Sequence, residues 1–176
     1  MFILKFSILG AHRSLIGRFL WNRTNLSHKP EINEETSPKV YCSWEEVEML
    51  VRNLAAKIQR SQKKYQIILG ITNGGIIPAR LMARELDIDH IQFIPVRNKE
   101  IQSDEMPILH KDNKYLIVDE IYDTGNIFSK VYDSIKGFEC EFAFLVSRYR
   151  NDHQVFVGKV LNNDRWVIFP WEMKRY

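Results

Sequence analysis

The residues of this chain best suited to chemistry are the carboxylates of Asp119, Glu120 and Asp123, in the stretch YLIVDEIYDTGN from Tyr115 to Asn126. Two adjacent carboxylates repel each other, so they indicate a cation or a polyhydroxylated ligand between them. The Thr-Gly turn that follows offers a hydroxyl and backbone N–H groups at a helix N-terminus, where phosphate binds. Acidic residues and Asp-Thr-Gly turns also precede helices for structural reasons alone. In the functional interpretation, one segment provides contacts for both a sugar and a phosphate.

Two glycines, Gly74 and Gly75, form a second candidate loop in TNGGIIP, from Thr72 to Pro78. They lie directly after an apolar run and before a helix, so the backbone can approach a ligand without an intervening side chain. A pyrophosphate group would fit such a loop. Glycine pairs also serve ordinary tight turns.

The carboxyl-terminal stretch DRWVIFPWE, from Asp164 to Glu172, is a third candidate. The indole of Trp166 offers a flat face for stacking, and Val167 and Ile168 offer backbone groups to the edge of a planar ring. The structural alternative is a core strand with two buried indoles.

These loops need a scaffold, which the hydrophobic pattern predicts. Ser43-Trp44-Glu45-Glu46 is a capping box, and apolar residues at helical spacing follow it as far as Ile58. Further helices are expected from about Pro78 to Leu86 and from about Asn126 to Ile135. Strands are expected at Tyr65–Ile71, Ile91–Val96, Tyr115–Val118, Phe142–Val146, Val155–Val157 and Trp166–Phe169. This alternation predicts an α/β fold with a mostly parallel, doubly wound sheet that binds ligands at the carboxyl ends of its strands.

Length and composition limit the classes of protein. The 176 residues, 45% of them hydrophobic, suit one compact domain. The net charge is +3, but beyond residue 39 the chain has 19 basic and 19 acidic residues, so no nucleic-acid partner is indicated. Cys42 and Cys140 match neither a disulfide scaffold nor a zinc site, which favours reduced thiols in a cytosolic protein.

Residues 1–38 differ from the rest, and we interpret them as an N-terminal extension or leader. Met1–Trp21 is apolar with scattered basic residues, and its apolar runs are interrupted too often for a stable membrane span. Basic residues and Ser without acidic residues resemble an organelle transit peptide, so targeting by residues 1–30 is one alternative to a cytoplasmic location. Two other interpretations of this segment are a disordered extension and a translation start assigned upstream of the true one. Lys29–Pro38 has the composition of a linker.

The order of these motifs resembles the type I phosphoribosyltransferases. The apolar strand followed by Asp-Glu-x-x-Asp-Thr-Gly is similar to their signature for phosphoribosyl pyrophosphate (PRPP), and the glycine loop followed by Pro78-Ala79 is similar to their pyrophosphate loop. The opening Val40–Trp44 and the FPWE end most resemble the xanthine-guanine enzymes. The resemblance implies a single-domain type I fold over residues 39–176, with a small hood.

The resemblance also implies a role for each candidate. Asp119 and Glu120 would bind the ribose hydroxyls of PRPP, and Asp123 would accept the purine proton as the catalytic base. The implied contacts to the 5'-phosphate are Asp123, Thr124, Gly125, Asn126 and Ile127, those to pyrophosphate are Asn73, Gly74 and Gly75, and those to the purine are Arg148, Trp166, Val167 and Ile168. Arg148 is otherwise interpreted as a solvated surface charge. Mg²⁺ would be held at Asp119, mostly through substrate and water.

The implied reaction transfers 5-phosphoribosyl from PRPP to a 6-oxopurine (guanine, xanthine or hypoxanthine) in purine salvage, by a homo-oligomer, a dimer or a tetramer. The polar segment 97–114 would be a loop that covers the reacting centre, or else an ordinary surface connection. Two positions depart from the family pattern: Asn73 replaces a common Arg or Lys, and Ile127 replaces Thr. The alternative is therefore a catalytically weakened regulatory protein that binds PRPP or nucleotides.

Overall fold

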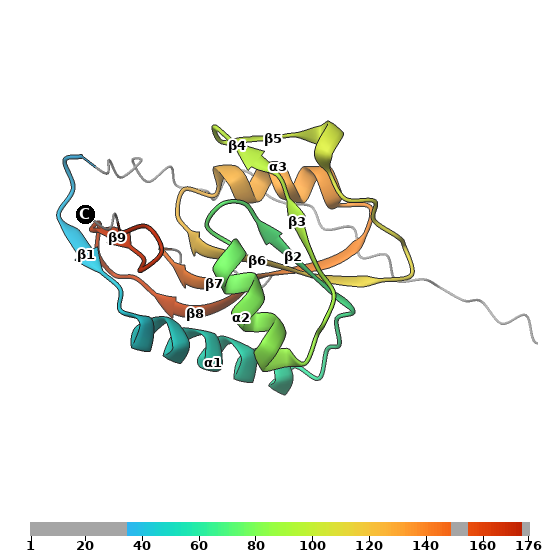
Figure 1. Ribbon diagram of the computed structural model, residues 1–176, viewed down its shortest axis with the longest axis horizontal. Helices are drawn as coiled ribbons and strands as arrows, with labels where there is room; N and C mark the ends of the chain where they lie inside the picture. Colours follow the sequence, from blue (N-terminus) through green and yellow to red (C-terminus); the bar gives the residue numbers. More distant parts are fainter. Residues whose placement is uncertain (1–34, 149–154, 174–176) are drawn as a thin grey trace, which may run out of the picture.

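A computed structural model describes residues 35–148 and 155–173. Its centre is a five-stranded sheet in the order β3-β2-β6-β7-β8, in which every neighbouring pair is parallel (Figure 1). The strands are β2 (Ile67–Ile71), β3 (Ile91–Ile94), β6 (Lys114–Tyr122), β7 (Glu139–Ser147) and β8 (Val155–Val160). The apolar runs therefore form buried parallel strands, as the sequence predicts.

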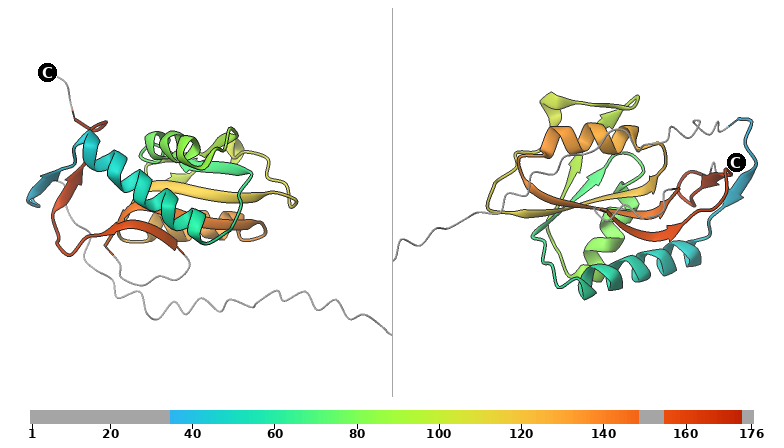
Figure 2. Two further views of the ribbon diagram at one scale, coloured as in Figure 1. Left: turned by 90° about the horizontal axis from the view of Figure 1, so that it is seen from below. Right: turned by 180° about the vertical axis from the view of Figure 1, so that it is seen from behind.

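Helices cover both faces of this sheet. On one face, α1 (Trp44–Arg60) packs against β7, β8 and α2 (Ile76–Leu86), and α2 packs against β2 and β6. On the other face, α3 (Asn126–Ile135) contributes Phe128, Val131 and Ile135 to a second hydrophobic cluster. Figure 2, left, shows α2 and α3 on opposite sides of the strands. The predicted α/β, doubly wound architecture is confirmed.

Helix α1 begins at the predicted capping box. Ser43 Oγ accepts a hydrogen bond from the Glu46 amide at 3.2 Å, and the Ser43 amide donates to Glu46 Oε2 at 2.9 Å. Two helical donors are thereby satisfied at the N-terminus. The predicted apolar stripe is buried against the sheet, with Val47, Leu50, Val51, Leu54, Ala55 and Ile58 all inside the core.

Strand β6 extends four residues beyond the predicted end at Val118. Asp and Glu are uncommon in strands, which is why the apolar pattern ends there. Pairing with β7 overrides that preference, since Asp119 lies opposite Phe144 and Ile121 lies opposite Val146. The acidic pair is consequently held in a rigid strand.

Two small two-stranded sheets complete the described structure. Strand β1 (Lys39–Tyr41) pairs in parallel with β9 (Trp166–Ile168), and this sheet is the hood. The Trp166 amide donates to Pro38 O and the Cys42 amide donates to Ile168 O, both at 2.9 Å.

The other small sheet is a hairpin of β4 (Val96–Arg97) and β5 (Glu100–Ile101), followed by the short 3-10 helix η2 (Ser103–Glu105). The polar segment expected as a loop thus begins as a hairpin, which packs on α3 (Figure 1). Within residues 35–148 and 155–173, no helix is long and apolar enough to cross a membrane. The leader predicted at residues 1–38 lies almost entirely outside the described residues.

Candidate active site

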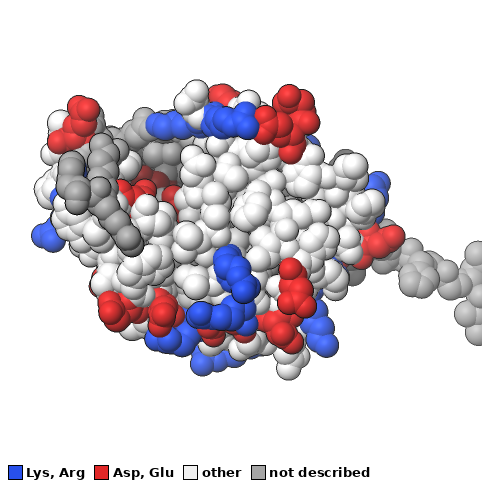
Figure 3. Space-filling model, viewed as in Figure 1, with Lys and Arg blue, Asp and Glu red and all other residues white. Residues whose placement is uncertain are grey.

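A cavity of about 590 Å³ lies at the carboxyl ends of β6 and β7, beside the hood strand β9, which contributes Trp166. Its size is typical of small-molecule sites. Figure 3 shows acidic side chains in a hollow of this face, below basic side chains over the β4–β5 hairpin. The lining residues come from β6, the turn into α3, β7, the hairpin and β9: Lys99, Asp119, Glu120, Ile121, Tyr122, Asp123, Thr124, Gly125, Asn126, Ile127, Phe128, Phe144 and Trp166.

The adjacent carboxylates of Asp119 and Glu120 are half-buried at this edge of the sheet. Burial, and then the neighbouring charge of Glu120, raises the pKa of Asp119 well above its usual value. Glu120 Oε2 is buried, and no atom of residues 35–148 or 155–173 hydrogen-bonds to it. A buried acceptor without a partner is costly, so the pair would gain from a cation or from ligand hydroxyls.

Glycine 74 makes room for one of these carboxylates. A Cβ built at Gly74 would lie 1.8 Å from Glu120 Oε2, so the turn between β2 and α2 meets the end of β6 there. Gly75 is enclosed by backbone instead, since a Cβ would lie 2.4 Å from Val118 O and 2.6 Å from Ile71 O. The peptide bond between Thr72 and Asn73, just before these glycines, is cis. Asn73 itself is exposed.

The turn between β6 and α3 presents main-chain donors to the cavity. Gly125 adopts the left-handed conformation, with φ 80°, at the N-cap of α3, which favours glycine there. Thr124 Oγ1 accepts from the Asn126 amide at 3.4 Å. Ile127, where the family pattern has Thr, is partly buried against the cluster of Phe128 and Val131. Its apolar side chain therefore has a packing role, and the N–H groups of the first helical turn can still bind an anion.

Asp123 is paired with a buried arginine. Arg148 Nε lies 2.7 Å from Asp123 Oδ1, and the two side chains are 2% and 26% exposed, respectively. The Nε–H bond is not aligned with this contact, so it is an ion pair rather than a hydrogen bond. Arg148 Nη1 and Nη2 donate to the main-chain oxygens of Asn163 and Arg165 at 2.8 and 2.7 Å. Arg148 is thus no solvated surface charge, and it does not line the cavity.

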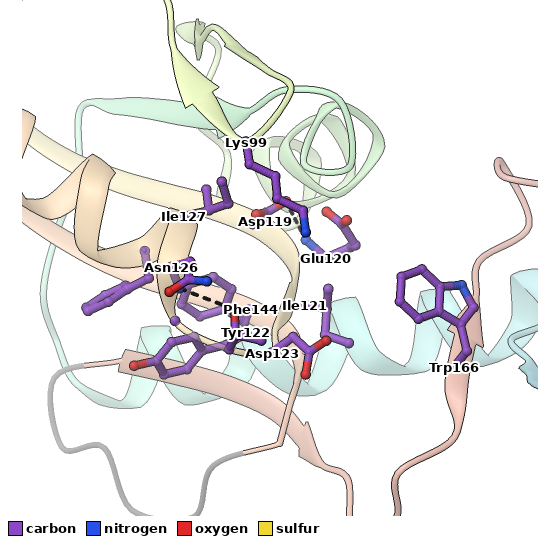
Figure 4. A pocket seen from close by; sticks show the side chains of 13 residues that line it. Lys99, Asp119, Glu120, Ile121, Tyr122, Asp123, Asn126, Ile127, Phe144 and Trp166 are labelled. Carbon is purple, nitrogen blue, oxygen red and sulfur yellow. Dashed lines mark hydrogen bonds between the residues drawn. The ribbon is translucent and has the colours of Figure 1, made fainter. Parts of the chain in front are cut away.

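Trp166 forms the wall of the cavity on the hood side. In Figure 4 its indole lies across the open space from Glu120, Ile121 and Asp123. Val167 and Ile168, the next two residues of β9, are half-buried and pair with Val40 and Tyr41 of β1. Of the predicted purine contacts, only Trp166 lines the cavity.

Lys99 lines the cavity although it was not among the residues predicted from the sequence. It lies at the tip of the β4–β5 hairpin, and its side chain points toward Asp119 and Glu120 (Figure 4). Asn98 and Lys99 have φ values of 51° and 61°, as in the two-residue turns of hairpins. Lys130 of α3 holds this tip by donating to Lys99 O at 2.8 Å. The sequence signal for this hairpin is Asn98 at the first position of the turn. It is weak because Lys99, rather than Gly, follows.

The arrangement suits magnesium carried by a phosphorylated substrate. Among the described residues, no group of three His, Cys, Asp or Glu side chains could hold a metal ion. Asp119 and Glu120 provide oxygen ligands, and Glu120 Oε2 has no protein partner in the described structure. Mg²⁺ commonly takes one or two carboxylates and completes its shell with water and phosphate oxygens, so these residues fit such an ion.

A parallel sheet with a hood, carboxylates at the end of a strand and a glycine turn at a helix N-terminus suit an enzyme that binds a phosphorylated sugar. Residues 40–176 match the family described as phosphoribosyl transferase domain. The chain belongs to this family and is a phosphoribosyltransferase, a glycosyltransferase-type enzyme. The type I fold and the family predicted from the motifs are confirmed.

Known proteins and solved structures are similar to this chain. A xanthine-guanine phosphoribosyltransferase of Chromohalobacter salexigens is 30% identical over 139 residues, which are 74% of this chain and 82% of that protein. One of Idiomarina loihiensis is 28% identical over 143 residues, 76% and 86% of the two chains. The crystal structure of a purine phosphoribosyltransferase from Pyrococcus horikoshii has a TM-score of 0.61 at 28% identity and covers 78% of this chain and 96% of its own.

Proposed function

We propose that this enzyme transfers the 5-phosphoribosyl group of PRPP to a 6-oxopurine (guanine, xanthine or hypoxanthine) in purine salvage, releasing pyrophosphate. The observation that carries the proposal is that Asp119, Glu120, Asp123, the turn into α3 and Trp166 line one cavity of about 590 Å³. A phosphosugar and a planar base could therefore be held next to each other. The names of the similar proteins support a purine as the acceptor.

PRPP would lie along the end of β6. The carboxylates of Asp119 and Glu120 would accept hydrogen bonds from the ribose hydroxyls, which would give the buried Glu120 Oε2 a partner. The turn of Asp123, Thr124, Gly125, Asn126 and Ile127 would hold the 5'-phosphate, mainly through the main-chain N–H groups at the start of α3.

The pyrophosphate would lie between the β2–α2 turn and the hairpin. The turn of Asn73, Gly74 and Gly75 brings backbone close to Glu120, and the hairpin brings the ammonium group of Lys99 toward the same place (Figure 4). Lys99 would supply positive charge that Asn73 cannot. Mg²⁺, bound at Asp119 and on the substrate, would neutralise the charge of the leaving group.

The purine would stack on Trp166. Val167 and Ile168, which follow Trp166 outside the cavity lining, would offer main-chain contacts to its edge. In the reaction, the bond from ribose C1' to the pyrophosphate oxygen breaks as the bond to the purine nitrogen forms. Asp123 would take the proton that the purine loses, for which it must be ionised. Its place in the cavity lining, on the turn opposite Trp166, is consistent with this role (Figure 4).

One assay tests the proposal. The purified full chain is incubated with PRPP, Mg²⁺ and guanine, hypoxanthine, xanthine or adenine, and pyrophosphate release is measured. We expect release with at least one 6-oxopurine and none with adenine. Absence of release with every base would refute the proposal, and PRPP binding without release would instead support the regulatory alternative.

The proposal also covers the oligomeric state, the cellular location and the domain bounds of the enzyme. We expect a homo-oligomer, a dimer or a tetramer, in the cytoplasm, with organelle targeting by residues 1–30 as the alternative. The enzymatic domain would comprise residues 39–176, after a leader of residues 1–38. Light scattering coupled to gel filtration would give the oligomeric state, and mass spectrometry of the native N-terminus would show whether the leader is retained.

A further inference from the structure

The buried guanidinium of Arg148 has partners on both sides of the proposed site. It follows the last residue of β7, and its amide donates to Tyr122 O at 3.0 Å, at the end of β6. The side chain then reaches Asp123 on one side and the main-chain oxygens of Asn163 and Arg165 on the other, all within 2.8 Å. Arg148 thus joins the turn after β6 to the segment leading into β9.

This segment is itself structured. The Arg165 amide donates to Asn163 Oδ1 at 3.1 Å, so the two carbonyl groups that Arg148 binds belong to one closed turn. Trp166 follows directly and begins β9. The position of the Trp166 backbone is therefore linked through Arg148 to the carboxylate of Asp123.

Burial makes this link strong. Arg148 is 4% exposed, and removing one partner of a buried ion pair is strongly destabilising. Two of its N–H groups donate to carbonyl oxygens, and Nε, which makes no hydrogen bond, lies against the charge of Asp123. Its absence from the cavity lining leaves it behind Asp123 rather than facing a ligand.

We propose that Arg148 is a positioning residue that fixes Asp123 relative to Trp166 and does not itself contact the purine. This inference rests on the proposed function. A purine stacked on Trp166 presents its proton to Asp123 only if these two walls keep a fixed separation, and a displacement of about 1 Å can cost roughly 100-fold in rate. Arg148 maintains that separation by binding both walls at once.

A double-mutant cycle tests the link without any assay of activity. Asp123→Asn and Arg148→Met are measured separately and together by urea unfolding, since Met removes both the charge that faces Asp123 and the donors that bind the two carbonyls. We expect the unfolding constant of the double variant to differ about fivefold or more from the product of the single effects. The control is Glu48→Gln with Arg52→Ala, an exposed pair 3.4 Å apart, which should be additive. Additivity of Asp123 and Arg148 would overturn the proposal.

Kinetics then separate positioning from direct contact. With Arg148→Lys, kcat/KM should fall roughly 10- to 100-fold for guanine and by the same factor for its 6-thio analogue, while PRPP affinity measured by calorimetry stays unchanged. Arg52→Ala should alter neither. If Arg148 donated to the 6-substituent, its replacement would lower kcat/KM by different factors for the oxygen and the sulfur compound. That result would overturn the proposal. If the wild type converts no base, the proposed function fails, whereas the unfolding cycle still decides whether Arg148 holds Asp123.

Discussion

The carboxylate of Glu120 occupies the space that a side chain at Gly74 would need, since a Cβ there would lie 1.8 Å from Glu120 Oε2. The two residues come from different strand ends, β2 and β6, and the proposal assigns them to pyrophosphate and ribose. Their contact brings these two proposed subsites together. The absence of a side chain at Gly74 therefore leaves room for the Glu120 carboxylate as well as for any ligand.

We predict that Gly74→Ala weakens PRPP binding with little loss of stability. The clash is with the end of a flexible side chain, so Glu120 can rotate away, and its carboxylate then leaves its present position. PRPP affinity should fall about tenfold, the value of one good charge-assisted hydrogen bond. Calorimetric titration with PRPP and Mg²⁺ measures the loss, and thermal unfolding measures the stability.

Two other glycines serve as controls for this variant. Gly137→Ala meets nothing within 4 Å and should change neither quantity. Gly75→Ala clashes with the main-chain oxygens of Val118 and Ile71, which cannot move aside, so it should destabilise the fold by about 1–3 kcal/mol. Full PRPP affinity in Gly74→Ala would contradict a ligand role for Glu120.

We predict that Asp119→Asn stabilises the protein at neutral pH while abolishing PRPP binding. Burial and the charge of Glu120 raise the pKa of Asp119 in the folded state. Such a carboxyl favours folding below its unfolded pKa of about 4, and this contribution is lost as the pH rises through the folded pKa. The neutral amide avoids the loss, so the variant should be about 0.5–2 kcal/mol more stable than the wild type at pH 7.

Urea unfolding across a pH series measures this difference, which should shrink as the pH falls toward 4. Asp133→Asn is the matched control, because Asp133 is exposed on α3 and pairs only loosely with Lys136 at 3.5 Å. Saturating PRPP and Mg²⁺ should stabilise the wild type but not the Asp119 variant. A variant less stable than the wild type at pH 7 would show that the ionised Asp119 is favourably held.

Local signals account for the parts of the fold that could be predicted. The capping box at Ser43 and the apolar runs of β2 and β7 depend on neighbouring residues, so their positions follow from the sequence. The end of β6 does not, because Asp119 continues the strand only by pairing with β7. The β4–β5 hairpin was also missed, since Lys130 of a different element anchors its tip.

In the site, too, local motifs could be predicted from the sequence and long-range contacts could not. Asp119, Glu120, Asp123, the turn into α3 and Trp166 were predicted together, and they line one cavity. The partners of Arg148 were not predicted, because they are distant in the sequence. Asp123 is 25 residues away, and the segment before Trp166 is about 16 residues away. Its type and position alone allow either a purine contact or a surface charge, and only tertiary packing reveals a buried ion pair.

We predict that Asn73→Arg raises activity. Asn73 is exposed beside the glycine turn, so an arginine can be accommodated without repacking and would bring positive charge toward the leaving pyrophosphate. At an exposed site the gain should be about 1 kcal/mol at most, or roughly fivefold in kcat/KM for PRPP. The gain should be larger in a Lys99→Ala background, where the hairpin no longer supplies a charge. Unchanged or lower turnover would count against a charge-neutralising role for position 73.

We predict that Asp123→Asn lowers kcat by about 10²- to 10⁴-fold, the usual contribution of general base catalysis, and leaves PRPP affinity nearly unchanged. An amide can still accept hydrogen bonds but cannot take the purine proton, whereas the main-chain donors of the turn into α3 remain. The variant also leaves the buried Arg148 without its counter-charge, so the assay must be run well below the unfolding temperature. Single-turnover kinetics with PRPP in excess measure the chemical step, and Asp133→Asn is the exposed control. If turnover and PRPP affinity fell by the same factor, Asp123 would be a structural residue held by Arg148 rather than the base.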